Sequence, residues 1–344
     1  MKARCFKHIL NFKKPSGTSR GVMTIKETWL IKIEDNEKIG IGECGILRGL
    51  SIDDREDYES TLKNICEQIH LGEKKLLEKL VEWPSIQFGI EQAFRSLKSE
   101  NEFELFPSKF TSGEDIIPIN GLIWMGSEDF MRAQIKEKTK AGFSCIKLKI
   151  GTIDFETELD ILKSIRKEFS KEDIELRVDA NGAFKTESAL EKLKRLSEFN
   201  LHSIEQPIMP KQFDEMAELC NNSPIPIALD EELIGVFDLK EKKRILQQIK
   251  SQYIILKPSL IGGYTGSQEW IDSAEELNIK WWVTSALESN IGLNAIAQWT
   301  YNLNNKLPQG LGTGGLFTNN FESPLIVKNG TLRYDKNLKW NFNL

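Results

Sequence analysis

Residues 145–151 read CIKLKIG and place two lysines, Lys147 and Lys149, inside what otherwise has the composition of a buried β-strand. A strand of a parallel sheet that is covered on both faces is expected to be a nearly continuous run of Val, Ile and Leu. Side chains two residues apart on a strand point to the same side, so both ammonium groups would face the same interior. Because an unpaired buried charge is costly, this interior must hold groups that compensate the two lysines.

Strand-like and helix-like segments alternate on both sides of this stretch, from about residue 116 onward. The apolar runs are IIPINGLI (116–123), CIKLKIG (145–151), IELRVDA (174–180), LHSIEQP (201–207), IPIALDE (225–231), YIILKPS (253–259), KWWVTSAL (280–287) and, less clearly, QGLGTGG (309–315). Amphipathic charged segments separate them. Eight strand–helix units predict an α/β fold with a (β/α)8 barrel. A doubly wound open sheet is the competing interpretation, but no GxGxxG motif opens a helix, which disfavours a dinucleotide site.

The first hundred or so residues follow a different pattern. Residues 22–34 and 37–43 alternate as antiparallel strands, and residues 54–82 and 85–98 have the apolar spacing of two or three helices. We therefore expect an α+β domain over residues 1–115 and a barrel over residues 116–315. The tail, residues 316–344, is expected to pack back on the first domain.

Composition excludes several classes of function. The 344 residues include 46 Lys and Arg against 51 Asp and Glu, and no basic stripe is present, which argues against a nucleic-acid partner. No apolar run approaches the roughly 18–20 residues of a membrane span, and we expect no membrane insertion. The five cysteines are scattered and form no CxxC pair, which fits a cytoplasmic protein. With three scattered histidines, a histidine-based zinc site is disfavoured.

Charged residues stand at the ends of five successive predicted strands, where a barrel enzyme assembles its active site. They are Lys149, Asp179, Glu205, Asp230 and Lys257, and successive members are 30, 26, 25 and 27 residues apart. Each interval is about one βα unit. Three converging carboxylates form an oxygen-only site suited to Mg²⁺, which could neutralise charge that develops on a substrate carboxylate when its α-proton leaves.

The two lysines could supply a general base together with a general acid or an electrostatic stabiliser. Lysine has an ordinary pKa of about 10.4, which burial, a second lysine and a nearby cation would all lower. Each residue alone has a structural alternative. A strand-end acid often caps a helix, Arg177 could pair with Asp179, and a buried lysine can extend its ammonium to solvent. The common register of all five residues favours the catalytic interpretation.

This set resembles the enolase superfamily, which is itself a known example of a lysine base used with Mg²⁺. The similarity is greatest to its muconate-lactonizing subgroup, through the motifs KxK (147–149), DAN (179–181), EQP (205–207), DE (230–231) and KP (257–258). The resemblance covers essentially the whole chain and implies a modified (β/α)8 TIM barrel with an α+β capping domain. It further implies a Mg²⁺ ion, replaceable by Mn²⁺, and the following roles: metal ligands Asp179, Glu205 and Asp230; catalytic residues Lys149 and Lys257; support of the substrate carboxylate by Lys147 and Asn181.

Within the subgroup, three features resemble the o-succinylbenzoate synthase family. They are SALESNIG (285–292), GLGTGG (310–315) and Arg177, from which we expect substrate contacts by Ser285, Gly312 and Arg177. Dipeptide epimerases of the subgroup place acids at the end of strand eight to hold a substrate ammonium. This chain has no acid between Lys306 and Asn320, which argues against such a substrate.

The resemblance implies a carbon–oxygen lyase of menaquinone biosynthesis that converts 2-succinyl-6-hydroxy-2,4-cyclohexadiene-1-carboxylate to o-succinylbenzoate. Lys149 would remove the α-proton, giving an enediolate, and return it to the departing hydroxyl, while Lys257 stays cationic. The alternatives are an N-succinylamino acid racemase or dipeptide epimerase, and an inactive barrel that serves as a scaffold. The sequence leaves the oligomeric state open, and residues 15–21, including Arg20, are either a loop that closes over the substrate or a plain flexible loop.

Overall fold

The computed structural model describes residues 1–18 and 21–342. Ser19 and Arg20, on which the interpretation of the 15–21 loop partly rests, lie outside the described residues. Within the described ranges, none of the helices combines the length and the apolar character that crossing a membrane requires.

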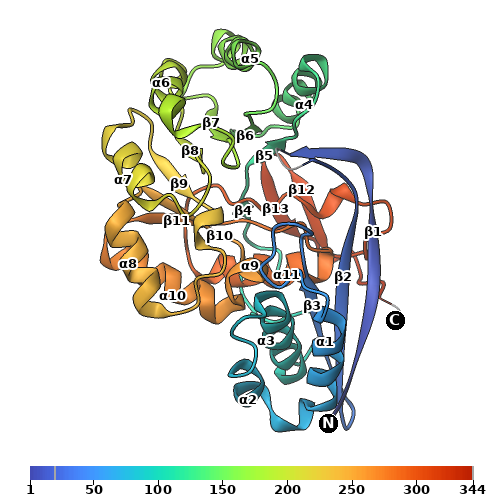
Figure 1. Ribbon diagram of the computed structural model, residues 1–344. Helices are drawn as coiled ribbons and strands as arrows, with labels where there is room; N and C mark the ends of the chain where they lie inside the picture. The colour runs from blue at the N-terminus through green and yellow to red at the C-terminus, as the bar shows by residue number, and fades with distance from the viewer. Residues whose placement is uncertain (19–20, 343–344) are drawn as a thin grey trace.

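The N-terminal domain is a three-stranded antiparallel sheet with helices on one side (Figure 1). Its elements are β1 (Lys2–Thr18), β2 (Gly21–Asp35), β3 (Lys38–Gly45), α1 (Tyr58–Glu67), the 3₁₀ helix η1 (Ile69–Leu71), α2 (Glu73–Leu77) and α3 (Pro84–Lys98). The predicted hairpin is confirmed, because β2 pairs with β3 and Asn36 makes the turn with a positive φ of 55°. The strands β1 and β2 form a long ribbon that extends past this domain to the barrel (Figure 1).

The barrel sheet contains seven parallel strands in the order β11-β10-β9-β8-β7-β6-β5, with every strand beside its neighbour in sequence. The strands are β5 (Gly121–Ile123), β6 (Cys145–Lys149), β7 (Glu175–Asp179), β8 (Ser203–Glu205), β9 (Ile227–Leu229), β10 (Tyr253–Leu256) and β11 (Lys280–Val283). The helices around them are α4 (Glu128–Lys140), α5 (Phe155–Glu168), α6 (Thr186–Ser197), α7 (Phe213–Asn222), α8 (Leu239–Ile249), α9 (Pro258–Ile261), α10 (Gly263–Glu276) and α11 (Asn290–Asn302), with 3₁₀ turns η2 (Glu231–Leu233) and η3 (Gly314–Leu316). The predicted barrel-like α/β fold is confirmed.

The seam of the barrel differs from the eight regular strands that the sequence predicted. Two isolated parallel bridges, Thr284 with Gly310 and Ile119 with Gln309, close the sheet. Residues 309–315 therefore contribute two single bridges, through Gln309 and Gly310, rather than a strand. The first predicted strand is also divided, because β4 (Ile117–Pro118) pairs with the C-terminal tail and β5 alone enters the barrel sheet.

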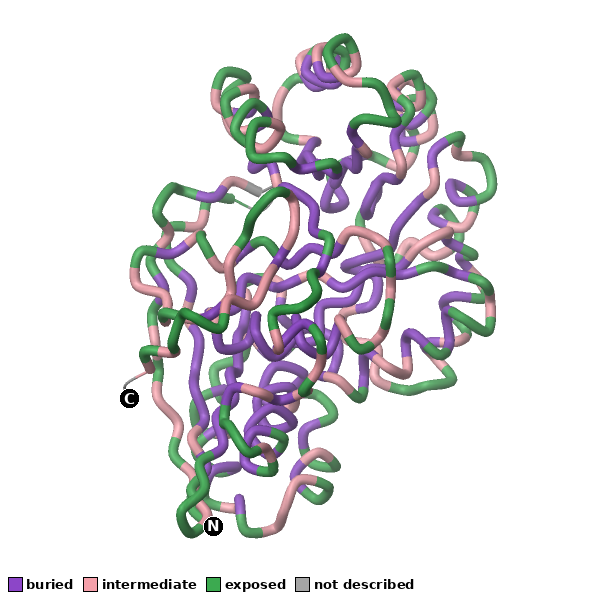
Figure 2. The backbone as a smooth tube through the Cα atoms, turned by 180° about the vertical axis from the view of Figure 1, so that it is seen from behind, coloured by how far each residue is buried: buried purple, intermediate pink, exposed green. Residues whose placement is uncertain are grey.

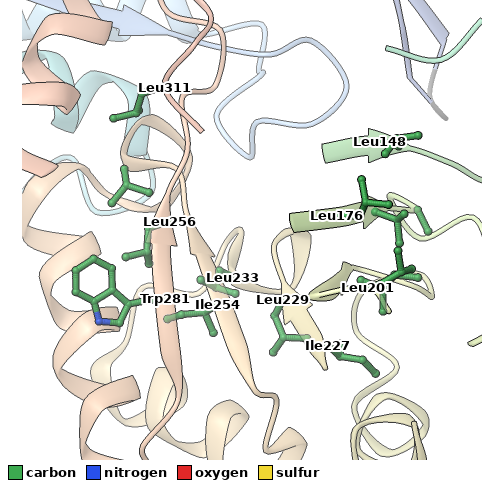
Figure 3. Close-up of a cluster of buried hydrophobic side chains, with 14 of the residues drawn as sticks. Leu148, Leu176, Leu201, Ile227, Leu229, Leu233, Ile254, Leu256, Trp281 and Leu311 are labelled. Atoms are coloured by element: carbon green, nitrogen blue, oxygen red, sulfur yellow. The ribbon is translucent and has the colours of Figure 1, made fainter. Parts of the chain in front are cut away.

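Alternation along the barrel strands separates an apolar layer from a polar interior. Leu148 lies between Lys147 and Lys149 and belongs to the main core, together with Leu176 of β7 and Leu229 of β9 (Figure 3). Buried backbone accordingly concentrates in the middle of the molecule, and exposed residues lie on the outer helices (Figure 2).

The C-terminal tail contacts both domains. Its strands β12 (Leu325–Lys328) and β13 (Thr331–Tyr334) form a sheet with β4. Before them, the tail runs beside β1, where the Thr318 amide donates to the Asn11 carbonyl at 2.9 Å and the Asn11 amide donates to Asn319 Oδ1 at 2.8 Å. Further along, Trp340 stacks on Phe103 with ring centroids 4.2 Å apart.

Two buried carboxylates of the first domain dock it on the N-termini of barrel helices. Glu91 of α3 accepts hydrogen bonds from the Tyr264 amide and from the amide and hydroxyl of Thr265, at the start of α10. Glu43 of β3 accepts from groups at the start of α11. Helix N-termini carry unpaired amides and partial positive charge, so each carboxylate replaces water as the acceptor.

Close packing of α3 on β3 depends on glycine. A Cβ added to Gly42 would lie 1.9 Å from the carbonyl oxygen of Gly89 in α3, a backbone atom that cannot rotate away. We expect Gly42→Ala to lower the free energy of unfolding by about 1–3 kcal/mol or more, the usual cost of overpacking. Gly315→Ala is the matched control, because nothing lies within 4 Å of its Cβ position. Urea unfolding of both variants tests this, and an equal effect would contradict the packing argument.

The Glu91 contact makes domain docking sensitive to pH. Burial raises the pKa of Glu91 from 4.5 to about 7, although the hydrogen bonds from Thr265 and Tyr264 counteract part of this effect. The folded protein therefore binds this proton more tightly, and the stabilisation is fully present below about pH 4.5 and is lost as pH rises through about 7. Between pH 5 and 8 the stability of Glu91→Gln should rise relative to wild type by on the order of 2–3 kcal/mol. Chemical unfolding across this range, with the exposed Glu78→Gln as control, measures it; a difference that stays flat with pH would contradict the assignment.

Candidate active site

A cavity of about 640 Å³ opens at the carboxyl ends of the barrel strands, between the barrel and the β1–β2 ribbon. Its walls include Lys149 and Lys257 from the barrel together with Pro15 and Met23 from the ribbon. The Gly17–Met125 bridge holds the ribbon against the loop after β5. Both domains thus contribute residues to one cavity.

Asp179 is the carboxylate that the two lysines of CIKLKIG share. Lys149 and Asp179 lie opposite each other in the pairing of β6 with β7. Lys149 Nζ donates to Asp179 Oδ2 at 2.9 Å and to Asn181 Oδ1 at 2.7 Å. Lys147 Nζ also lies 2.9 Å from Asp179 Oδ2 and contacts Glu205. Although burial opposes it, the two lysines hold the pKa of Asp179 well below its ordinary value.

Lys257 occupies the equivalent position on the far side of the ring. Its ammonium contacts Asp230 and lies 3.9 Å from Glu205 Oε1. Burial lowers the pKa of Lys257, but Asp230 and Glu205 outweigh this effect and leave it raised. The pKa of Lys147 is also raised, because Asp179 and Glu205 outweigh burial. This direction is opposite to the lowering that the sequence predicted for lysines in this site.

Glu205 is the least satisfied acid of the ring. It is 2% exposed, and neither carboxylate oxygen accepts a well-formed hydrogen bond from the described residues. Burial and the neighbouring Asp179 raise its pKa well above the ordinary value. A buried acid with these properties calls for a cation in its vicinity.

The backbone beyond the ring is held in place by polar side chains of the same motifs. Asn181 has a φ of 45°, its amide donates to Asp179 Oδ1 at 3.0 Å, and its side chain donates to Glu231 Oε1 at 2.9 Å. Gln206 accepts hydrogen bonds from the amides of Asp230 and Glu232. Gln206, which follows Glu205, therefore holds the turn that presents Asp230, and Asn181 reaches the same turn through Glu231.

As they stand, no three His, Cys, Asp or Glu side chains of the described chain form a group ready to hold a metal ion. Lysine ammonium groups lie between the acids instead. The donor set nevertheless suits Mg²⁺, because Asp179, Glu205 and Asp230 offer only oxygen, and Glu205 accepts no well-formed hydrogen bond from the described residues.

Ser285 and Gly312 both line the cavity, as predicted substrate contacts should. The Ser285 hydroxyl donates to Glu288 Oε2 at 2.6 Å and accepts from the Thr313 hydroxyl at 2.9 Å and the Leu287 amide at 3.0 Å. Its hydrogen-bonding capacity is thus used by the protein. A direct bond from Ser285 to a ligand would require one of these bonds to be given up.

Arg177 lies apart from the other predicted site residues. It is 1% exposed, donates to Glu175 Oε1 and to the Pro308 carbonyl, and lies 4.3 Å from the ring centroid of Trp282. Its expected structural partner, Asp179, is taken by the lysines. Arg177 is on the same side of β7 as Asp179 but lies one layer below it, where its guanidinium reaches Glu175, the Pro308 carbonyl and the Trp282 ring rather than the cavity.

The sequence analysis missed cavity residues on the first barrel strand and the ribbon. Asn120 lines the cavity, is 6% exposed, and its Oδ1 accepts no hydrogen bond from the described residues. Its position directly after the apolar run IIPI was the available signal. The described lining also carries seven cationic side chains and one acid, Glu137; the cations are Lys13, Lys14, Arg48, Lys138, Lys147, Lys149 and Lys257. Such a cavity favours an anion, although the chain has a net charge of −5.

Comparison with known proteins gives two family matches. Residues 130–337 match the model described as enolase C-terminal domain-like, and residues 1–97 match the MenC N-terminal domain. The chain is 46% identical to the o-succinylbenzoate synthase of Desulfotalea psychrophila, over 94% of this chain and 96% of that protein.

Solved structures agree with these matches. The crystal structure of MenC from Desulfotalea psychrophila superposes with a TM-score of 0.86 and 41% identity, over 97% of this chain and 99% of that one. A dipeptide epimerase from Cytophaga hutchinsonii, solved with Mg and the dipeptide D-Ala-L-Val, gives a TM-score of 0.81 at 21% identity, with 98% of each chain covered. At this lower identity the likeness concerns the fold.

Proposed function

This chain belongs to the o-succinylbenzoate synthases, which are lyases of the enolase superfamily, and we propose that Lys149 and Lys257 carry out their dehydration reaction. The substrate would be 2-succinyl-6-hydroxy-2,4-cyclohexadiene-1-carboxylate and the products o-succinylbenzoate and water. The observation that carries the proposal is the pair of lysines that line one cationic cavity, with Lys149 bonded to the buried Asp179 and Lys257 in contact with the buried Asp230.

Lys149 is the proposed general base. Its contacts with Asp179 and Asn181 fix Nζ at the cavity wall. In its neutral form it would take the proton from the ring carbon that carries the carboxylate. The electron pair left behind forms the last double bond of the aromatic ring as the C–O bond to the hydroxyl breaks. Lys149 returns the proton to this oxygen, which leaves as water.

Lys257 is the proposed electrostatic partner. Its raised pKa, set by Asp230 and Glu205 against burial, is that of a lysine that stays protonated. A fixed ammonium on the face opposite the base stabilises negative charge as it develops on the substrate carboxylate. Lys147, whose pKa is raised as well, would help to hold this carboxylate rather than exchange protons.

Asp179, Glu205 and Asp230 would hold a Mg²⁺ ion. When bound, this ion would supply the charge that binds the substrate carboxylate and favours loss of its α-proton. The Asn120 side-chain amide, whose oxygen accepts no hydrogen bond from the described part of the chain, lines the cavity. Together with the backbone beside Gly312 it offers polar groups to the rest of the substrate. Seven cationic side chains in the described lining suit a substrate that carries two carboxylates.

Turnover and its metal dependence can be measured directly. We expect the purified protein with Mg²⁺ to consume the cyclohexadiene absorbance of the substrate, and an excess of chelator to abolish this activity until Mg²⁺ is restored. Full turnover in chelator would contradict the assigned ligands. The alternative racemase activity predicts rapid exchange of the α-proton of N-succinylamino acids in D₂O; exchange without any dehydration would overturn the proposed function.

Lys149 and Lys147 should respond unequally to substitution. Lys149→Ala removes the general base, and we expect kcat to fall by at least about 10²–10⁴-fold. Lys147→Ala should weaken turnover, mainly through KM, because it removes a binding group. Lys242→Ala is the control, since Lys242 is equally buried but pairs with Glu269 on the outer helices. Equal losses for Lys147 and Lys149, or a retained kcat in Lys149→Ala, would argue against these roles.

A further inference from the structure

Lys26 is a buried lysine that the proposed mechanism does not use. It lies on β2, is 4% exposed, and its Nζ makes no hydrogen bond with the described residues. Burial lowers its pKa, and Glu43 and Glu288 act in the opposite direction. A lysine is rarely retained in such a position unless nearby charges compensate it.

Glu43 and Glu288 supply this compensation from two different domains. The Cβ position of Gly45 lies 2.9 Å from Lys26 Nζ and 3.6 Å from Glu43 Oε1. The Cβ position of Gly292 lies 2.9 Å from both Glu43 Oε2 and Glu288 Cγ. Each glycine therefore makes room for the charged groups. We refer to Lys26, Glu43 and Glu288 as the Lys26 cluster.

The two acids of the Lys26 cluster hold the loops that follow β10 and β11. Glu288 accepts from the Ser259 hydroxyl at 2.5 Å and from the Ser285 hydroxyl at 2.6 Å. Ser259 comes two residues after Lys257, and Ser285 lines the cavity. Glu43 accepts from the Thr28 hydroxyl of β2, from Ser289, and from the Gly292 amide in α11. Through Glu288, the cluster thus holds Ser259, which lies near Lys257, and Ser285, which lines the cavity.

Lys26 itself marks the foot of the ribbon over the cavity. The strands β1 and β2 pair regularly up to Leu10 with Lys26 and Asn11 with Ile25, and the register then shifts before Ser16 pairs with Met23. Beyond this shift, Ser16 and Met23 line the cavity and Gly17 bridges to Met125. A shift in pairing is a natural place for a ribbon to bend.

We infer that Lys26 is a positioning residue: its charge attracts Glu43 and Glu288 and so fixes the part of the β1–β2 ribbon that lines the substrate cavity at Ser16 and Met23. The inference deepens the proposed function and rests on it for the identity of the substrate. It predicts that Lys26 acts on substrate binding through the ribbon, while the lysines of the barrel act on chemistry. A purely structural ion pair would affect stability alone.

Lys26→Met keeps the length of the side chain and removes its charge. We expect KM to rise about tenfold while kcat changes by less than about threefold, because the ribbon contributes binding rather than the reacting groups. Lys242→Met is the matched control: it removes a buried lysine that pairs with Glu269 outside the barrel, and it should lower stability without raising KM. An unchanged KM in stably folded Lys26→Met would overturn the inference.

Limited proteolysis tests the role of Lys26 in holding the ribbon without measuring enzyme activity. Lys13 is exposed and lies within the register shift of the ribbon, between Asn11 and Ser16, so trypsin cleavage after Lys13 reports opening of this segment. We expect Lys26→Met to be cleaved there several times faster than wild type and Lys242→Met to be cleaved at the wild-type rate. Equal rates in all three proteins would contradict this role. Absence of synthase activity in the wild type, by contrast, would overturn the proposed function and leave this readout decisive.

A double variant covers the case in which Lys26→Met folds poorly. Lys26→Met combined with Glu288→Gln removes one positive and one negative charge, and the introduced glutamine can still bond the Ser259 and Ser285 hydroxyls, which can donate or accept. The thermal midpoint should therefore recover relative to the single variant. The tie between ribbon and barrel stays absent, and KM and cleavage after Lys13 should remain raised. Recovery of KM together with the thermal midpoint would show that charge balance alone matters and would overturn the inference.

Discussion

The Asp179 carboxylate pairs with the ammonium groups of both Lys147 and Lys149, and much of the barrel rim is arranged around this shared carboxylate. Two like charges on one strand can be buried only if the neighbouring strand brings an acid into the same layer. The parallel register of β6, β7 and β8 does so, since Lys149, Asp179 and Glu205 lie side by side. The charge requirement of one short strand therefore constrains the strands beside it.

The first domain is attached to the barrel by a related use of charge. Glu91 and Glu43 each place a buried carboxylate on the amides that begin a barrel helix. Such contacts need an exact approach of two domains, because a displaced carboxylate would be left buried without donors. The ribbon that covers the cavity belongs to this domain, so its placement over the substrate depends on the same two helix ends. The contacts that dock the two domains thus also determine where the ribbon covers the site.

Much of the site could be predicted from sequence because it follows from period and spacing. The intervals between Lys149, Asp179 and Glu205 match one βα unit, which places them in one layer whatever the details of the loops. Side-chain direction is less accessible. Arg177 is on the same side of its strand as the interior residues, but its guanidinium donates to Glu175. The Ser285 hydroxyl donates to Glu288 instead of remaining available to a ligand. Neither choice can be read from the strand pattern, although both partners are close in sequence. More distant residues fix the two groups, because Arg177 also donates to the Pro308 carbonyl and Glu288 also accepts from Ser259.

The stability of this fold must come from elsewhere than the site. Burying lysines and acids together costs desolvation that their attraction only roughly repays, whereas well-packed apolar groups would stabilise the same volume better. The apolar layer behind the strands, with Leu148, Leu176 and Leu229, supplies the hydrophobic burial that the rim lacks. Successive side chains of a strand point to opposite faces, so each barrel strand has two roles. One face packs in the apolar core and stabilises the fold, and the other holds the charged groups of the site, whose burial is unfavourable. That division explains why lysines occur within CIKLKIG at all.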